Sequence, residues 1–146
     1  MSRKLLSHLT HSQSIDESFP SLRIDAVDEP GFGGAHHRYE ITGFDMTDNP
    51  SATDGGWAWR STQFSRAVIV FQNGGLNKDG VPTVSNGITN EALLAIVIDR
   101  LQCFQKGPFR CDDNEVALDY ARSALAALHR RTEEREARGV EGRHVL

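Results

Sequence analysis

The stretch "VSNGITNEALLAIVIDRL", residues 84–101, decides the fold. A polar turn at residues 85–87 leads into seven consecutive apolar residues, 92–98. A surface helix of a small domain normally buries a single apolar stripe, whereas a helix of this sequence is apolar on nearly every side. The stretch therefore predicts a helix that needs cover on more than one face, and it raises the question of what the preceding turn contacts.

This first helix has clear boundaries in the sequence. Thr89 is a suitable N-cap, and Glu91 in the first turn complements the positive end of the helix dipole. Lys106 lies in the last turn, and Gly107 with the following proline stops the helix. The predicted helix therefore runs from about Thr89 to Lys106.

A second helix is expected after a short turn. It begins at Asp112, whose spacing from Glu115 fits a capping box, and it continues to about Arg138 before Gly139 ends it. Its apolar stripe follows alternating steps of three and four residues. The members of the stripe are Leu118, Ala121, Leu125 and Leu128. The two helices together form an αα-hairpin.

The helical period divides the apolar residues of the first helix into two groups. One group is expected to pack on the second helix. It contains Leu93, Val97, Leu101 and Phe104. The other group still needs cover and contains Leu94, Ile96 and Ile98. Two solutions are open: a second copy of the chain, which we favour, or a sheet that curls over both exposed faces.

Three segments of the first half have strand patterns. Residues 21–27 and 36–44 alternate apolar and polar side chains and flank the Gly-rich turn 28–35, which predicts a β-hairpin with a long loop. Residues 65–72 are rich in β-branched residues and form the clearest strand. The predicted fold class is α+β: a small antiparallel sheet of about three strands, followed by a long C-terminal αα-hairpin and assembled as a homo-oligomer.

The remaining segments lack a regular period. Residues 1–20 are rich in Ser, His and Thr, which predicts a flexible N-terminal arm before a single sheet-plus-hairpin domain at residues 21–146. Residues 73–87 form a long Gly/Asn-rich loop, and loops of this length are more often functional or mobile than idle.

Composition restricts the function classes. The chain has 146 residues, 38% of them hydrophobic, and a formal net charge of -4, which gives no global attraction to nucleic acid or to an anionic membrane. We expect neither a membrane span nor a signal peptide. Cys103 and Cys111 flank the turn between the helices, and we expect two reduced thiols rather than a disulfide.

Any anion site must therefore be local, and two features suit one. Arg131, Arg135 and Arg138 share one helical face, and arginine grips phosphate oxygens with a planar fork. Alternatively, this is an ordinary solvated face whose arginines pair with neighbouring glutamates. The polar turn at Asn86 and Gly87 has backbone N–H groups at a helix N-terminus, which suit an anion. The alternative interpretation is an ordinary turn that starts a helix and binds nothing.

No catalytic constellation is apparent. His36 and His37 are adjacent, so on a strand they point to opposite faces and do not bind one metal together. His129 lies beside the arginines but reads as a surface residue. Phe71, at the end of the third strand, suits either base stacking or core packing. Trp57 and Trp59 leave the same choice open, with packing favoured.

Four segments carry a resemblance to a known family. They are "DEPGFGGAHHRYEITGFD", "IVFQNGG", "NGITNEALLAIVIDRLQCFQKGPF" and "RRTEEREARGVEG", and together they span roughly residues 24–145. In this order they resemble the small phage proteins that share the helical hairpin of anti-Thoeris and anti-CBASS proteins. Such proteins act as sponges that bind cyclic nucleotide immune signals without cleaving them.

The resemblance implies a homohexamer with pockets between subunits, no cofactor, and no enzymatic activity, acting in the cytoplasm of the infected bacterial host. In the anti-Thoeris branch the ligand is a cyclic ADP-ribose isomer, and related members also take cyclic di- or trinucleotides. By motif, Phe71 would stack on an adenine, and Asn86 with the Gly87 backbone would hydrogen-bond the ligand. Four arginines would meet phosphates or close a pocket: Arg131, Arg135, Arg138 and Arg143.

One segment departs from the family pattern. The connection between "FQNG" and "NG" is usually short, whereas "GLNKDGVPTVS" is longer here and borders the implied pocket. Two other functions stay open: a cyclic nucleotide phosphodiesterase, with His129 or His144 as its base, and a phage structural or assembly protein that uses the hairpin as a scaffold. A polymer nucleic-acid binder is disfavoured by the net charge.

Overall fold

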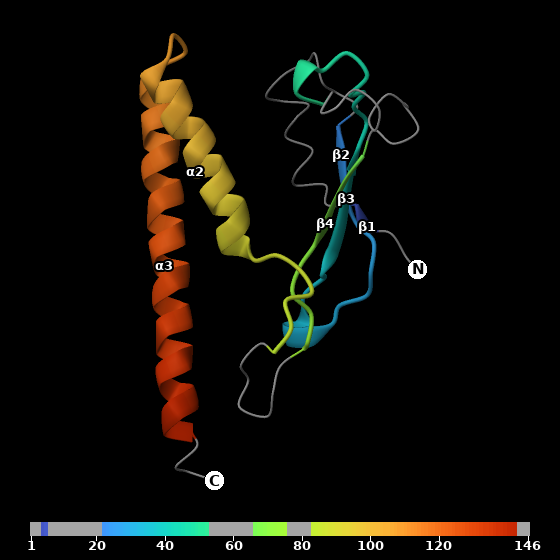
Figure 1. Cartoon of the computed structure of the whole chain (residues 1–146), viewed down its shortest axis with the longest axis vertical. Coiled ribbons are helices and arrows are strands. Elements are labelled where there is room, and N and C mark those ends of the chain that lie inside the picture. Colours follow the sequence, from blue (N-terminus) through green and yellow to red (C-terminus); the bar gives the residue numbers. More distant parts are fainter. Residues whose placement is uncertain (1–3, 6–21, 53–65, 76–82, 143–146) are drawn as a thin grey trace. The chain divides into compact units, whose positions relative to one another are not determined.

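The structure is a computed structural model that describes residues 4–5, 22–52, 66–75 and 83–142. It divides into two compact units, Met1–Asn73 and Gly74–Leu146. The first contains the sheet and the second contains the helical hairpin (Figure 1). The two units are described separately below.

The sheet unit contains a four-stranded antiparallel sheet with the order β1-β2-β3-β4. The strands are β1 (Lys4–Leu5), β2 (Arg23–Ala26), β3 (Arg38–Thr42) and β4 (Ala67–Val70). The three predicted strands, two from alternating patterns and one from its β-branched residues, are confirmed as β2, β3 and β4. β1 is a two-residue edge strand in a segment where no period indicated one. The rest of the predicted arm and Trp57 and Trp59 lie outside the described residues.

The register of the strands sorts the side chains onto two faces. Ile24 is paired with Ile41, and Ala26 is paired with Tyr39, which in turn faces Ile69 on β4. These residues line an apolar face, in which Ala26 is completely buried. Because side chains alternate along a strand, the intervening pair of Asp25 and Glu40 lies on the opposite, charged face.

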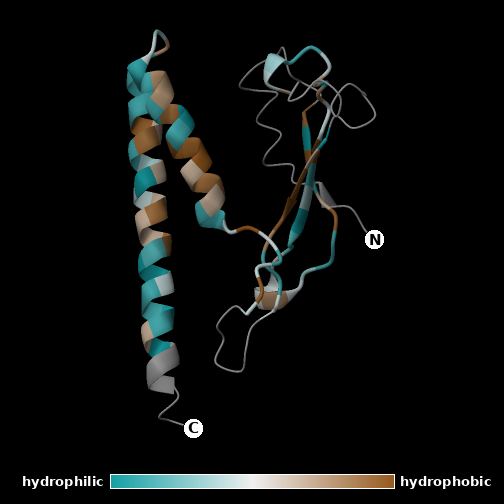
Figure 2. Cartoon of the chain, in the orientation of Figure 1, coloured by the Kyte–Doolittle hydropathy of each residue, from teal (hydrophilic) through white to brown (hydrophobic). Residues whose placement is uncertain are grey.

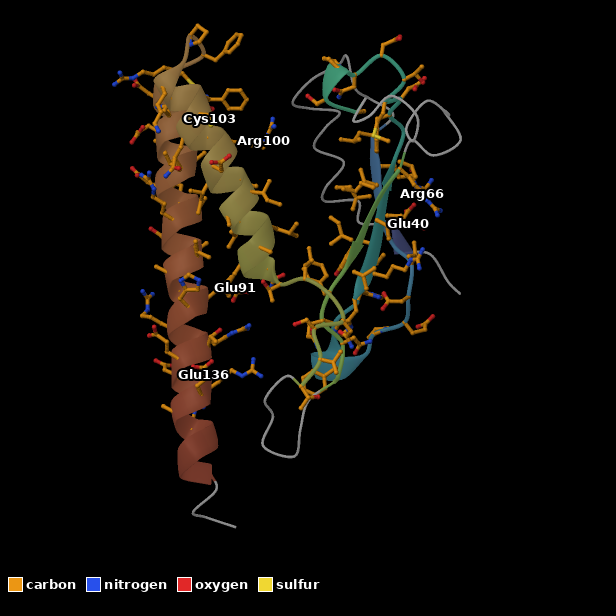
Figure 3. The ribbon with its side chains drawn as sticks, in the orientation of Figure 1. Glu40, Arg66, Glu91, Arg100, Cys103 and Glu136 are labelled. Atoms are coloured by element: carbon orange, nitrogen blue, oxygen red, sulfur yellow. The ribbon has the colours of Figure 1, made fainter. Side chains whose placement is uncertain are left out.

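The charged face buries its carboxylates and exposes its arginines. Asp25 and Glu40 are only 1% and 3% exposed. The Nε–H of Arg23 donates to both Asp25 oxygens, at 3.0 and 3.1 Å. Arg38 and Arg66 each lie 3.3 Å from the same Glu40 oxygen, and Figure 3 shows Arg66 beside Glu40. Pairing of this kind offsets the cost of burying the two negative charges.

The hairpin unit contains two antiparallel helices. The first, α2 (Asn90–Lys106), begins as predicted: the Thr89 hydroxyl accepts a hydrogen bond from the Ala92 N–H at 3.2 Å. The N–H of Gly107 donates to the Phe104 carbonyl and ends the helix. No helix in the described part of the chain is both long enough and apolar enough to cross a membrane.

The second helix, α3 (Asp112–Gly142), begins at the predicted residue, but its N-terminal cap and its C-terminal end differ from the prediction. Asp112 is the first helical residue, so the expected capping box at Asp112 is wrong. Cys111 precedes it, and its Sγ accepts a hydrogen bond from the Asn114 N–H at 3.4 Å. The predicted stop at Gly139 is also wrong, because a glycine followed by helix-compatible residues weakens a helix without ending it.

The turn between the helices is held by one amide side chain. The Oε1 of Gln105 accepts from the Cys111 N–H at 3.1 Å, and its Nε2 donates to Glu115 of α3 at 2.9 Å. Cys103 and Cys111 are both exposed and carry free thiols. Gln105 therefore joins the last turn of α2 to the first turn of α3.

The packing face of α2 is rotated by one residue from the predicted face. Leu94, Ile98 and Leu101 are half-buried, whereas Val97 and Phe104 are 45% and 37% exposed. Of the predicted group, Leu93 is half-buried as well, along with the shared Leu101. Leu101 belongs to both the predicted stripe and the stripe that contains Leu94 and Ile98. The helical period alone does not show which of the two stripes packs on α3. Gln105, bonded to the turn and to α3, extends the stripe that is covered. On α3 the predicted stripe is confirmed: Leu118 is only 3% exposed, and the other three members are half-buried.

Candidate functional site

The turn before α2 is built as an exposed helix start. Asn86 is exposed and Gly87 is half-buried, directly before the Thr89 cap. Further back, the N–H and hydroxyl of Thr83 both donate to the Gly75 carbonyl at 2.7 Å, which fixes the base of this segment. The first N–H groups of any helix lack partners within the helix. The turn therefore has the donor geometry that suits an anion or a polar ligand edge.

The arginines of α3 extend from a hydrophilic part of the helix. Arg131, Arg135 and Arg138 are all exposed, and the C-terminal half of α3 is mostly hydrophilic (Figure 2). Within the described residues, none of the three makes an ion pair. The alternative arrangement, in which Arg138 pairs with Glu134, is not present. Three cationic side chains on one helical face are therefore open to an anion.

Phe71 lies at the end of β4 and is half-buried. Its N–H donates to the His37 carbonyl at 2.7 Å, which continues the pairing of β4 with β3. Its ring meets Tyr39 edge to face, with the ring centroids 5.7 Å apart and the planes at 89°. Such a contact fixes the direction of the ring, and the exposed part of the ring stays accessible.

Asp28 is a structural residue close to Phe71 in the chain of hydrogen bonds, and the sequence patterns did not single it out. Asp28 begins the loop between β2 and β3, and its carboxylate accepts hydrogen bonds from the N–H groups of His37 and Arg38. Burial alone would raise the pKa of this carboxyl group, but these two N–H donors and nearby His36 hold the pKa below its ordinary value. An aspartate directly before a Gly-rich turn was the only sequence sign of such a role.

The structure groups some of the predicted site residues and not others. Asn86 and Gly87 are adjacent before α2, and the three arginines share α3, all in the hairpin unit. Phe71 belongs to the sheet unit, and Arg143 lies outside the described residues. Among the described residues no group of three or more His, Cys, Asp or Glu side chains is placed to hold a metal.

The hairpin also exposes large apolar side chains. Ile96 is 58% exposed and Val97 45% exposed on α2, while Val116 and Tyr120 are 50% and 73% exposed on α3. Arg100 lies over the ring of Phe104, with 5.5 Å from its Cζ to the ring centroid, on the side of α2 turned away from α3 (Figure 3). Exposed apolar side chains on both helices make the hairpin a candidate interaction surface.

These features define a class: a small antiparallel sheet followed by a helical hairpin with cationic and apolar surfaces. The sequence model of the "Acb2/Tad1, hairpin domain" family matches residues 65–133, from the start of β4 into α3. The chain is also 46% identical over 78 residues to a protein of Bacillus phage SBSphiJ7 named "Thoeris anti-defense 1". That match covers 53% of this chain and 52% of the phage protein.

The resemblance drawn from the sequence is therefore confirmed over residues 65–133, which match the Acb2/Tad1 hairpin domain. The chain spans about half the length of the curated relative that it matches. The matched residues contain Phe71, Asn86, Gly87 and Arg131, whereas Arg135 and Arg138 follow the matched segment.

Proposed function

We propose that this protein is a non-catalytic phage protein that sequesters cyclic nucleotide immune signals and so lets a phage evade bacterial Thoeris or CBASS defence. The observation that carries the proposal is the family match over residues 65–133, together with a 46%-identical relative named for anti-defence. The ligand class is a cyclic ADP-ribose isomer, a cyclic di- or trinucleotide, or both. The site of action is the cytoplasm of the infected host.

The geometry of the hairpin unit supports an anionic ligand. The exposed arginines of α3 supply charge-assisted hydrogen bonds, each contributing about 1.5–3 kcal/mol. The turn at Asn86 and Gly87 supplies a polar side chain and helix-start N–H groups. Phe71 supplies an aromatic face for a base, a contact of about 1–3 kcal/mol. The groups of the hairpin unit suit the phosphates of such a ligand, and Phe71 of the sheet unit suits a purine.

The exposed apolar residues of α2 and α3 support assembly as a homo-oligomer, and the family resemblance implies a hexamer. Ile96 and Tyr120 are each more than half exposed in a single chain. A second copy would remove this apolar surface from water. Assembly would also bring pocket residues from different copies together, which is how the resemblance places Arg143.

Recovery of the bound ligand tests the proposal directly. The protein is incubated with a cyclic ADP-ribose isomer or with cyclic di- and trinucleotides, freed of unbound ligand, and heat-denatured. Intact cyclic ligand in the supernatant is the expected result. Linearised product would instead indicate a phosphodiesterase. If none of these ligands raises the melting temperature at saturation, the chain is a scaffold and not a sponge.

Substitution of the arginines identifies the phosphate contacts. Arg131→Ala and Arg135→Ala should each weaken ligand binding by roughly tenfold or more, because each removes a charge-assisted hydrogen bond. Isothermal titration calorimetry measures the change. Arg122→Ala is the matched control, because Arg122 is also exposed on α3 but lies on the opposite side of the helix. Equal losses in all three variants would refute a specific arginine site.

A further inference from the structure

We infer that Asp28 is a positioning residue for ligand binding: it holds the ring of Phe71 in place by two separate routes through its neighbours. The inference rests on the proposed function, in which Phe71 stacks on a base of the ligand. All residues involved lie in the sheet unit. The carboxylate of Asp28 anchors the first route and its backbone carbonyl anchors the second. Neither route was evident from the spacing of residues in the sequence.

The first route follows the backbone. The N–H of His37 donates to the two carboxylate oxygens of Asp28, at 3.0 and 3.2 Å. The carbonyl of His37 then accepts from the N–H of Phe71 at 2.7 Å. The position of the His37 peptide, and through it the backbone of Phe71, therefore depends on the Asp28 carboxylate.

The second route follows the rings. The Nδ1 of His36 lies 2.7 Å from the backbone carbonyl of Asp28, so this nitrogen carries the proton and donates to that oxygen. The His36 ring meets Tyr39 edge to face at a centroid distance of 6.5 Å, and Tyr39 meets Phe71 in the same manner at 5.7 Å. The three rings form a series that starts at Asp28 and ends at the proposed stacking residue.

The loop that carries Asp28 is shaped to bring these groups together. It contains η2 (Phe32–Gly34), with Gly33 at φ +74°, a conformation that favours glycine. At Gly31 an added Cβ would lie 3.3 Å from the His37 Nδ1 and from the Asn73 amide, so little room is left for a side chain. The loop therefore folds closely over the end of β3 that faces Phe71.

Charge on Asp28 strengthens the arrangement. The pKa of this carboxyl group is lowered in the folded protein, although burial opposes the shift, because backbone N–H groups donate to the ionised form. The stability that the carboxylate contributes is present above the unfolded-state pKa of about 4. It is lost as the pH falls through the lower folded-state pKa. The difference in melting temperature between wild type and Asp28→Asn should therefore shrink in strong acid.

A double-mutant cycle tests the inference, because a residue that acts through Phe71 has no effect once that ring is removed. Asp28→Asn places an amide NH₂ group near the N–H donors in place of a carboxylate oxygen. It should weaken binding of the cyclic ADP-ribose isomer by about three- to tenfold. Phe71→Ala should weaken it by roughly tenfold or more. The double variant should bind like Phe71→Ala alone.

Additive losses in the cycle would overturn the inference, because they would mean that Asp28 acts independently of Phe71. If wild type binds none of the cyclic nucleotides, the proposed function fails; if it binds them and Phe71→Ala has no effect, the stacking role fails. Asp45→Asn is the matched control, because Asp45 also accepts a backbone N–H, from Thr47 at 2.9 Å, but in the segment that follows β3 and not in the Asp28 loop. It should leave affinity unchanged.

A second variant keeps the test decisive if Asp28→Asn fails to fold. Tyr39→Leu removes the ring between His36 and Phe71 while keeping an apolar residue on the same face of β3. Its loss of affinity should also vanish in the Phe71→Ala background. A Tyr39→Leu variant that binds like wild type would overturn the ring route.

Discussion

The sheet unit and the hairpin unit handle their charged and apolar side chains in opposite ways. In the sheet unit the carboxylates of Asp25 and Glu40 are buried and each is paired with arginine. In the hairpin unit the arginines of α3 are exposed without ion pairs among the described residues, and Ile96 is exposed although it is apolar. The charged groups of the sheet have partners within the chain, whereas the surfaces of the hairpin are available for partners outside it.

This difference indicates which unit depends on other molecules. A buried ion pair contributes little beyond offsetting its own desolvation, and it favours one specific arrangement. An exposed apolar face costs free energy until a partner covers it. An unpaired stripe of arginines makes charge-assisted hydrogen bonds only when an anion binds. In the proposed function, the sheet unit holds Phe71, and the hairpin unit contacts a second copy of the chain and an anion.

The largest effect is expected from breaking the hairpin surface. Ile96→Asp places a charge on the exposed apolar face of α2, so the assembly should dissociate to monomers. Size-exclusion chromatography with light scattering measures the mass. Arg110→Asp, in the exposed turn between the helices, should leave the mass unchanged. An Ile96→Asp variant with the mass of wild type would show that this face does not join subunits.

An intermediate effect is expected from breaking the charged face of the sheet. Glu40→Gln removes the charge that Arg38 and Arg66 share, and should lower the free energy of unfolding by about 1–2 kcal/mol. The loss stays modest because both arginines are about half exposed and remain hydrated. Urea denaturation measures it, with the exposed Asp48→Asn as control. A more stable Glu40→Gln variant would mean that relief of the facing Asp25 charge outweighs the lost pairs.

The smallest effect is expected at the turn of the hairpin. Gln105→Ala removes the hydrogen bonds to Cys111 and Glu115, which are exposed to solvent, and should lower the free energy of unfolding by about 1 kcal/mol. Gln102→Ala, one turn earlier on α2, should change it by less. The same urea titration compares the two variants. Equal values would show that the turn keeps its shape without the Gln105 amide.

The sequence predicted the elements of the fold better than their faces. Alternation at residues 21–27 and 36–44 identified β2 and β3, because a strand with one apolar face must alternate. The β-branched residues of 65–72 identified β4. Thr89 identified the start of α2, because a hydroxyl cap acts locally. The packing face of α2 was misplaced, because an almost uniformly apolar helix offers several stripes of equal hydrophobicity.

The cap of α3 and the hydrogen bonds of Asp28 could not be predicted from the sequence, for related reasons. A sulfur cap such as that of Cys111 is weak and uncommon. The cap was therefore predicted at the following aspartate, Asp112, instead. The bonds of Asp28 to the peptides of His37 and Arg38 span nine and ten residues, and nothing in local spacing reports them. The arginines and the Asn86 turn were found from spacing, whereas their ligand was inferred from family resemblance.

Native mass spectrometry of the full chain with a cyclic ADP-ribose isomer and with cyclic di- and trinucleotides tests the central claim most directly. It measures subunit number and bound ligand in the same spectrum. The account predicts a multimer, a hexamer by family resemblance, that retains intact cyclic nucleotide. A monomer that retains none of these nucleotides would contradict it.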